Sequence, residues 1–556
     1  MYLATFRERY FAVTASDSSS SAIGRTDRSS LDLLEAGLLP PLPAALIGGR
    51  DLDLLEPLRL VGGGELPETG AAVVDRQELA AGLATANAAY GHPAATTLAQ
   101  RLADPETRVV VTGQQPGLLG GPLYTLSKAV AAALWAERLE EAGTPAVALF
   151  WVATEDHDFR EVSRAVFLAP GGPRTFTLGE DPEPLLPVGM RSLGEEVASV
   201  LNDLREAMPG ERFAEWVETL GRWYRPEARF GEAFCRLLAH LLGERCPLLV
   251  DAMLPAVKAA ERPWLEQLVA KRHEVDRALA EINNRIEGRG YQLQVKPQPG
   301  ASPLFLLHSR ARRRIEWMAE DRMVLRGCHD VDEPVSWLET TIEENPGVVS
   351  PGVQARPLIQ DAILGTSLQV LGPGELSYMP QVAPLYDLLG VRAPAIALRP
   401  QILVLEDHQW EKLDGTGLGL GQLLSSKLDL DRLLSAGAGE DLLAPVRSQL
   451  EGPMSELREA ALEIDPGLQG PWEKTQGQME RALGVFEAKI SAAAARRDEV
   501  TRQRVEKLRN LCRPLGSPQE RVVSTSQFPG KYGDSFAAAL FEQLRLDGGN
   551  LQVISP

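Results

Sequence analysis

The stretch Thr107–Glu161, TRVVVTGQQPGLLGGPLYTLSKAVAAALWAERLEEAGTPAVALFWVATEDHDFRE, decides the fold of this chain. Its short apolar run at 109–111 ends in a glycine-rich turn, and a helical segment over 122–141 follows. A second apolar run at 146–153 ends in a cluster of acids around a histidine. Strand, turn, helix and strand in this order predict a βαβ unit whose parallel strands are buried on both faces.

Two polar segments follow the two predicted strands, at the place where ligands bind to parallel sheets. Such ligands lie beyond the carboxyl ends of the strands. The first segment is Gly113–Gly117 (GQQPG) and the second is Glu155–Asp158 (EDHD). We therefore expect the two loops to face each other across a single crevice.

The first loop offers backbone and amide groups to a polar ligand. Gly113 allows a tight turn, and the free N–H groups at the start of the helix at Pro122 favour an anion. Gln114 and Gln115 supply amide donors and acceptors. The loop is neither a GxGxxG fingerprint nor a P-loop. A plain tight turn is an equally good interpretation of these residues.

The second loop places three carboxylates and an imidazole within four residues. His157 in a strand-end loop suits a general base, a phosphate ligand or a metal ligand, and Asp156 or Asp158 could orient it. The alternative is a helix-capping loop, because acids before a helix are common. The position of Glu155 and its neighbours directly after a buried strand favours function. A zinc site is not favoured, because no other His or Cys has partner spacing.

A third group of candidates lies downstream, in the segment GPGELSYMPQ at 372–381. Gly374, Glu375 and Tyr378 combine a glycine turn with polar side chains at a helix start. Arg356 lies just upstream and suits a carboxylate or phosphate, which its guanidinium can bind with two hydrogen bonds. Taken alone, Arg356 is better interpreted as a partner in a structural ion pair.

The tail carries a further motif, Pro529–Gly533 (PGKYG). Lys531 offers a cation and Tyr532 an aromatic face, and Gly533 follows them, a combination suited to a nucleotide or a phosphate. A simple turn is the preferred interpretation of this motif when it is taken alone.

The composition bounds the classes of function. The 556 residues carry 57 Lys and Arg against 76 Asp and Glu, a net charge of −19, which argues against nucleic-acid and anionic-membrane partners. The densest basic run, Arg310–Arg314, sits between predicted strands, so we expect a solvated turn. The four cysteines show no metal-ligand spacing, and no apolar run reaches membrane-spanning length, so we expect reduced thiols in a cytoplasmic protein.

Other patterns predict individual elements. Ala165–Leu168 and Thr175–Leu178 form a hairpin, and short strands at 291–295, 304–308 and 315–317 indicate an antiparallel insertion. Core strands are expected at 367–371 and, near an edge because of its proline, at 395–405, with a helix over 376–389 between them. Helices are expected over 441–464 and over 472–512. Met479, Leu483, Phe486, Ile490 and Ala493 in the latter form a heptad seam that an antiparallel pair with 441–464, or a partner chain, would bury.

Several segments together resemble the BshC family of bacillithiol biosynthesis. They are VTGQQPGLLGGPLYTLSKA, FWVATEDHDF, ARPLIQD, LGPGELSYM, and PQERV followed by KYG, and they run in order from Val111 to Gly533. The resemblance implies an α/β fold with a Rossmann-like parallel-sheet core similar to class I aminoacyl-tRNA synthetases. It also implies two connective-peptide insertions and a C-terminal α-helical coiled coil that makes a homodimer.

Changes of composition divide the chain in agreement with this plan. The expected segments are the first part of the core (1–161), connective peptide 1 (162–245), core (246–290), connective peptide 2 (291–345), core (346–407), the coiled-coil domain (408–515) and a segment returning to the core (516–556). The turn at Gly113–Gly117 stands where class I synthetases carry HIGH, and no KMSKS motif is present.

The activity that the resemblance implies is a carbon–nitrogen ligase that adds L-cysteine to glucosaminyl-malate, with ATP and Mg²⁺ presumed to activate the carboxyl. His157 and Asp158 are then the expected catalytic residues. The expected substrate-binding residues are Gly113, Gln114, Gln115, Glu155, Asp156, Arg356 and Tyr378. The expected nucleotide-binding residues are Gly374, Glu375, Lys531, Tyr532 and Gly533. The alternative is a non-catalytic ligand-binding or scaffold protein with a degenerate Rossmann core.

Overall fold

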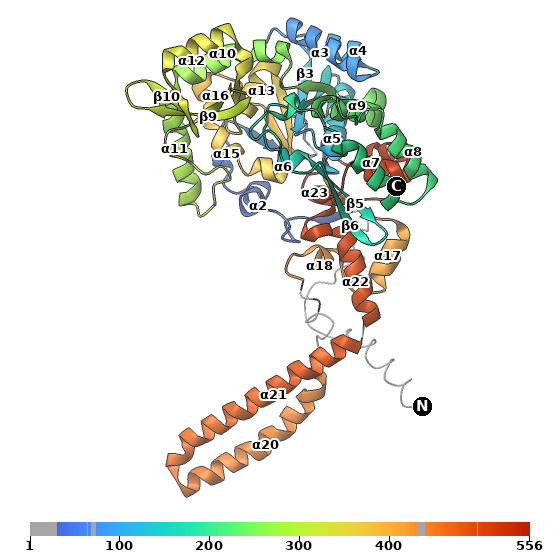
Figure 1. Ribbon diagram of the computed structural model, residues 1–556. Helices are drawn as coiled ribbons and strands as arrows, with labels where there is room; N and C mark the ends of the chain where they lie inside the picture. The colour runs from blue at the N-terminus through green and yellow to red at the C-terminus, as the bar shows by residue number, and fades with distance from the viewer. Residues whose placement is uncertain (1–29, 64, 68–73, 429, 431–439, 498) are drawn as a thin grey trace.

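The molecule consists of a head, which contains the sheets, and a helical hairpin that projects from the head (Figure 1). The computed structural model describes residues 30–556 except 64, 68–73, 429, 431–439 and 498. Within the described residues, no helix combines the length and apolarity that crossing a bilayer would need.

The head is built on a six-stranded sheet in which every neighbouring pair of strands is parallel. Its strand order is β2 (Arg59–Val61), β14 (Ala395–Leu398), β13 (Thr366–Leu371), β3 (Arg108–Gln114), β4 (Ala146–Val152) and β7 (Leu248–Asp251). The predicted βαβ unit is confirmed, with α5 (Tyr124–Glu141) between β3 and β4. All residues of β4 are buried, as expected for a strand covered on both faces.

Alternate residues of β3 enter two separate hydrophobic cores, one on each face of the sheet. Val110 packs with apolar residues of α5, α9 (Phe230–Leu242) and α25 (Ser535–Gln543). Val109 and Val111 pack with those of α3 (Gln77–Tyr90), α10 (Pro255–Ala270) and α13 (Arg356–Leu364). The C-terminal segment therefore completes the core that the opening βαβ unit begins.

Two antiparallel units lie outside this sheet. The predicted hairpin is confirmed as β5 (Arg164–Ala169) and β6 (Gly172–Thr177). The second unit is a sheet of β8 (Ala301–His308), β9 (Ala311–Met318), β10 (Arg322–Leu325), β11 (Cys328–Pro334) and β12 (Val349–Pro351). The strand expected at 291–295 is absent from these described residues, which form bends and loop.

The solvated turn expected at Arg310–Arg314 is wrong for most of the run. β9 begins at Ala311, and Arg312 pairs with Leu307 of β8 in the antiparallel register. The side chain of Arg312 is only 6% exposed. A run of arginines that looks solvated in the sequence thus sends one guanidinium into the interior.

Prolines explain two further corrections. The single edge strand expected at 395–405 is two strands, because the chain leaves β14 before Pro400 and continues as β15 (Gln401–Val404) in another sheet. That sheet also contains β1 (Ser30–Asp32) and β16 (Asn550–Ile554), and β14 itself lies inside the central sheet. The helix expected over 376–389 is three short helices that each begin with a proline at the first or second position. They are α14 (Pro373–Leu376), α15 (Met379–Val382) and α16 (Pro384–Leu389).

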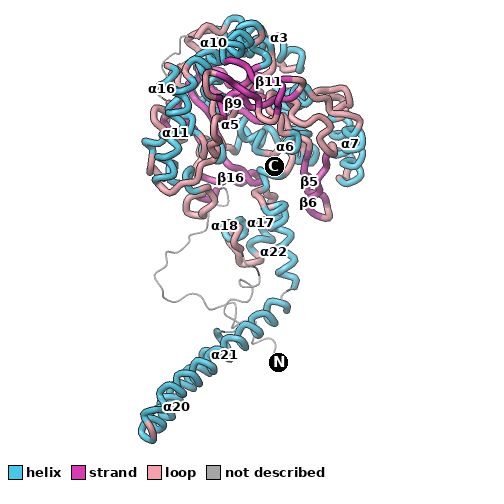
Figure 2. The backbone as a smooth tube through the Cα atoms, turned by 60° about the vertical axis from the view of Figure 1, so that its left-hand side comes forward, coloured by secondary structure: helices cyan, strands magenta, loops and turns pink. Residues whose placement is uncertain are grey.

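The projecting hairpin consists of α20 (Glu440–Ile464) and α21 (Gln469–Arg497), which run antiparallel as predicted (Figures 1 and 2). The expected helix over 472–512 is divided between α21 and α22 (Glu499–Cys512), and residue 498 lies outside the described residues. Val505 and Leu508 of α22 pack with Leu403 of β15, which anchors the hairpin to the head. Phe486 of the expected seam is 56% exposed.

Candidate active site

The two loops that follow β3 and β4 touch each other. Gln115 donates hydrogen bonds from Nε2 to Oδ2 of Asp156 at 2.9 Å and to Oε2 of Glu161 at 2.8 Å. Their strands pair directly, with Gly113 opposite Trp151. The expectation that the two loops lie together at the carboxyl ends of neighbouring strands is confirmed. The crevice expected between them stays a prediction.

Gly113 is required by the close approach of β4. A Cβ atom at this position would lie 2.7 Å from the carbonyl oxygen and 2.9 Å from Cβ of Trp151. These atoms belong to a buried central strand that has no room to move. Gly113 thus shapes the loop through backbone packing.

Replacing Gly113 with alanine is expected to lower the free energy of unfolding by about 1–3 kcal/mol, the usual range for overpacking. The same change should displace Gln114 and Gln115, which follow directly. Urea unfolding measures the loss, and Gly288→Ala is the control, since a Cβ at Gly288 would meet no atom within 4 Å. Equal stability of the two variants would contradict the close-packing argument.

Lys128 of α5 is the centre of a buried polar cluster that sequence reasoning missed. Its Nζ donates to the carbonyl oxygen of Gly113 at 2.7 Å and to Oε1 of Gln114 at 3.1 Å, and it lies 2.5 Å from Oε2 of Glu375. Burial lowers the pKa of Lys128. Burial alone would raise the pKa of Glu375, but the charge and hydrogen bond of Lys128, together with the backbone N–H of Gly372 and the charge of Arg356, lower it. A lysine inside a largely apolar helix was the available signal.

Arg356 lies beside Tyr378 and has neutral partners. Its Nη2 donates to the hydroxyl of Tyr378 at 3.1 Å and its Nη1 to Oε1 of Gln360 at 3.0 Å. Within the described part of the chain, no carboxylate forms an ion pair with it, so the structural ion pair preferred from the sequence is wrong. Burial opposes the charge, yet Tyr378 and Glu375 raise the pKa of Arg356. Burial also raises the pKa of Tyr378 to about 12.

His157 contacts a residue from the antiparallel insertion. Nη1 of Arg312 lies 3.2 Å from Nδ1 of His157, whereas Oδ1 of Asp156 lies 3.7 Å from the same nitrogen. The carboxylate of Asp158 instead caps α6 (Phe159–Val162) by accepting a hydrogen bond from the backbone N–H of Glu161 at 3.1 Å. Asp158 therefore does not orient the imidazole. Arg312 and Asp156 lie next to Nδ1 of His157 instead.

Glu155 turns away from the crevice into a buried cluster. Lys258 of α10 donates to Oε2 of Glu155 at 2.7 Å and to Oε2 of Glu261 at 2.8 Å. The Oε1 atoms of both glutamates are buried without a hydrogen-bond partner. Burial raises the pKa of Glu261 to about 7. Glu155 thus anchors its loop to α10, and its contacts do not support direct substrate binding.

The candidates for nucleotide binding separate into two places. Gly374 and Glu375 lie in α14, directly after the inner strand β13, and Glu375 pairs with Lys128. Lys531 and Tyr532 of α24 (Gln527–Tyr532) both contact Glu406, with the phenol hydroxyl of Tyr532 donating to its Oε1 at 2.5 Å. Gly533 follows α24 with φ 71°, a left-handed conformation that ends the helix.

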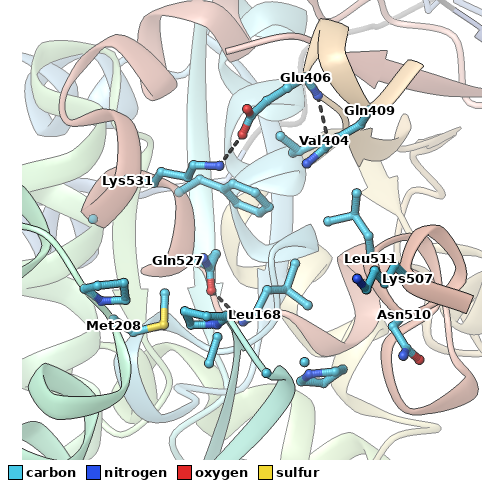
Figure 3. A pocket seen from close by; sticks show the side chains of 18 of the residues that line it. Leu168, Met208, Val404, Glu406, Gln409, Lys507, Asn510, Leu511, Gln527 and Lys531 are labelled. Carbon is cyan, nitrogen blue, oxygen red and sulfur yellow. Dashed lines mark hydrogen bonds and ion pairs between the residues drawn. The ribbon is translucent and has the colours of Figure 1, made fainter. Parts of the chain in front are cut away.

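Lys531 and Tyr532 line a separate cavity of about 970 Å³, which Figure 3 shows from close by. Its walls come from the β5–β6 hairpin, α8 (Glu211–Leu220), α17 (Asp407–Asp414), α22 and α24. Cations, amides and aromatic rings line it, among them Arg212, Lys412, Lys507, Asn510, Gln527 and Phe528. This combination suits an anionic ligand with a flat ring. Of the lining residues, the sequence indicated only those of the motif Pro529–Gly533.

Two models of one protein family match consecutive parts of the chain. The model of the N-terminal Rossmann-like domain of bacillithiol biosynthesis BshC matches residues 65–400. The model of the C-terminal coiled-coil domain of BshC matches residues 402–555.

Curated relatives match most of the chain. The protein of Salinibacter ruber named "Putative cysteine ligase BshC" is 30% identical over 498 residues, covering 86% of this chain and 89% of the relative. A protein of the same name from Heliobacterium modesticaldum is 31% identical over 461 residues, covering 80% and 82%. A solved structure titled as an arginyl-tRNA synthetase from Campylobacter jejuni covers 85% of this chain and 99% of its own at 12% identity. The TM-score of this match is 0.24.

Proposed function

This chain belongs to the BshC family of bacillithiol biosynthesis, and on that premise we propose that it is an ATP-dependent carbon–nitrogen ligase joining L-cysteine to glucosaminyl-malate. The single observation that carries this proposal is the contact between the β3 and β4 loops. There Gln115, Asp156 and His157 from two strands meet in one place.

Arg356, Gln114 and Gln115 suit a substrate that carries carboxylates. Arg356 has no carboxylate partner in the described part of the chain, and its two hydrogen bonds go to neutral groups. A guanidinium in this state can still bind a carboxylate through its charge. Gln114 and Gln115 add amide groups at the same edge. These features support malate and cysteine carboxylates as ligands.

The cavity lined by Lys531 and Tyr532 has groups that suit a nucleotide. Its aromatic rings suit a base, and its lysines and arginines suit phosphates. Mg²⁺ would enter with the phosphates, because this ion is commonly held by one or two carboxylates together with substrate phosphates. Bound ATP supplies the activation that forming an amide in water requires.

Lys531→Met is expected to weaken ADP and ATP binding about 10-fold or more. The change removes a cation and leaves Glu406 without its ion partner beside the incoming phosphates. Isothermal titration with ADP measures the affinity. Lys474→Met, on the exposed face of α21, is the matched control. Unchanged ADP affinity in Lys531→Met would show that the nucleotide does not bind in this cavity.

The activity test uses the purified full chain with L-cysteine, glucosaminyl-malate, ATP and Mg²⁺. The expected result is bacillithiol, identified by mass, with one ATP consumed for each product. Arg356→Met is expected to raise the KM for glucosaminyl-malate. Product formed without ATP would overturn the nucleotide requirement, and no product under any condition would overturn the ligase proposal.

We further propose that the hairpin of α20 and α21 makes a homodimer. Large apolar side chains on it are exposed, notably Leu457 at 58%, Val485 at 59% and Phe486 at 56%. Exposed apolar surface of this kind marks association sites. Sedimentation equilibrium of the full chain gives the oligomeric state, and a monomer at micromolar concentration would contradict the proposal.

A further inference from the structure

His157 is held by a residue that can only donate hydrogen bonds. Arg312 carries no acceptor and keeps its charge at any ordinary pH. Its Nη1 lies 3.2 Å from Nδ1 of His157, within hydrogen-bond distance. Nδ1 must therefore be the unprotonated acceptor of this contact, and the proton of the neutral ring lies on Nε2.

Arg312 is itself fixed on every side. Its Nε donates to Oγ of Ser350 at 2.8 Å and its Nη2 to the carbonyl oxygen of Pro351 at 2.8 Å. Its guanidinium lies 4.0 Å from the ring centre of Phe305. The side chain is 6% exposed, so it cannot swing away from the imidazole at low cost. β8, β9 and β12 of the insertion thus hold one donor against the core loop.

The other nitrogen of His157 faces no protein partner. No hydrogen bond to Nε2 occurs within the described residues, and the side chain is 26% exposed. Asp156 lies 3.7 Å from Nδ1, on the same nitrogen as Arg312, and does not reach Nε2. The Nε2–H group is therefore the part of the ring available to a ligand.

We infer that His157 acts as a neutral hydrogen-bond donor, binding an oxygen of the substrate through Nε2–H, and that Arg312 is the positioning residue that enforces this tautomer. The identity of that oxygen, a carboxyl or acyl oxygen of the ligase substrates, rests on the proposed function. The general base expected from the sequence is thereby replaced. Taking a proton at Nδ1 would break the bond to Arg312 and place an imidazolium against a guanidinium. The proton stays on Nε2 throughout.

Burial, with the Arg312 charge as the next cause, lowers the pKa of His157 and agrees with a neutral ring. A neutral imidazole with a lowered pKa that polarises a substrate carbonyl is a known catalytic arrangement on other folds. The first test needs no activity. In the full chain labelled with ¹⁵N-histidine, the ring signals of His157 are identified by their loss in His157→Gln. These signals should show that at pH 7 Nε2 is protonated and Nδ1 is unprotonated.

The second test separates a donor from a base. Glutamine at position 157 places an amide N–H near Nε2 but cannot accept a proton. We expect His157→Ala to lower kcat about 100-fold, the usual cost of one lost donor to a reacting oxygen, and His157→Gln to stay within about 10-fold of wild type. Equal losses in both variants would favour a base and overturn the inference.

The third test addresses Arg312. Arg312→Met should let the tautomers of His157 mix and raise its pKa. Arg313→Met should change neither, because this half-buried neighbour on the same strand donates to the carbonyl oxygens of Arg326 and Gly327. If the methionine variant does not fold, Arg312→Lys takes its place in the test. Lysine retains a donor, so this variant is expected to keep the Nε2–H tautomer. Wild-type protein with Nδ1 protonated would overturn the inference even if bacillithiol is made. Wild-type protein with the expected tautomer but no product would overturn only the ligase proposal.

Discussion

Lys258→Met is expected to lower the free energy of unfolding by about 3–5 kcal/mol, the cost of removing one partner from a buried ion pair. Lys258 lies between Glu155 and Glu261, and their side chains are 5% and 0% exposed. Without the Lys258 ammonium, the carboxylates of Glu155 and Glu261 would share one buried site without their common ion partner. Because Glu155 begins the loop that carries His157, the variant should also lose most of its ligase activity.

The glutamates provide the matched controls. Glu261→Gln should cost far less than Lys258→Met, because Lys258 keeps its bond to Glu155. Lys258→Met combined with Glu261→Gln should recover part of the loss, since only one buried carboxylate remains. Urea unfolding at pH 7 measures all three variants. A loss below about 1 kcal/mol in Lys258→Met would show that water reaches this cluster.

The same cluster predicts a pH dependence of stability. Burial raises the pKa of Glu261 from its ordinary value of 4.5 to about 7, so the folded state binds this proton more tightly than the unfolded state. The contribution of Glu261 to stability is therefore greatest below about pH 4.5 and declines as the pH rises towards 7. In Glu261→Gln this decline should disappear. If the stability of the wild type and of Glu261→Gln changed in parallel between pH 4.5 and 7, the raised pKa would be contradicted.

Arg399→Met is expected to cost about 3–5 kcal/mol for the same physical reason at a different place. Arg399, directly after β14, binds both carboxylate oxygens of Glu520 in α23 (Gln519–Val522) at 2.8 and 2.7 Å. The two side chains are 3% and 1% exposed. Glu520 also accepts the backbone N–H of Ile402 at 2.8 Å. The pair thus ties the tail to the point where the chain passes between two sheets.

Arg245→Met is the matched control, because Arg245 forms the same two-bond contact with Glu137 at the surface. Those side chains are 44% and 38% exposed, and the Arg245 guanidinium also lies 3.6 Å from the ring centre of Phe541. Its loss should therefore cost about 1–2 kcal/mol, well below the cost of Arg399→Met. Thermal unfolding measures both variants, and limited proteolysis should cut the tail of Arg399→Met first. Similar costs in the two variants would show that burial of the Arg399 pair has no special weight.

The local pattern of the sequence was enough to predict the elements around the crevice. The apolar run of β4 and the acids after it require a buried parallel strand ending in a polar loop, and periodicity reports this directly. The hairpin of β5 and β6 and the helices α20 and α21 follow from equally local patterns. The meeting of Gln115 with Asp156 could be predicted because the two strands are neighbours joined by one helix.

Only the tertiary structure decided which side chains complete the site. Arg312 lies 155 positions from His157, and Lys258 lies 103 positions from Glu155. No periodicity links such positions, because their contact depends on how an insertion and a distant helix fold back on the sheet. Burial, which sets the charge state of each group, is likewise a property of the packed molecule. The sequence by itself determined where the loops lie, and packing determined what His157 can do in them.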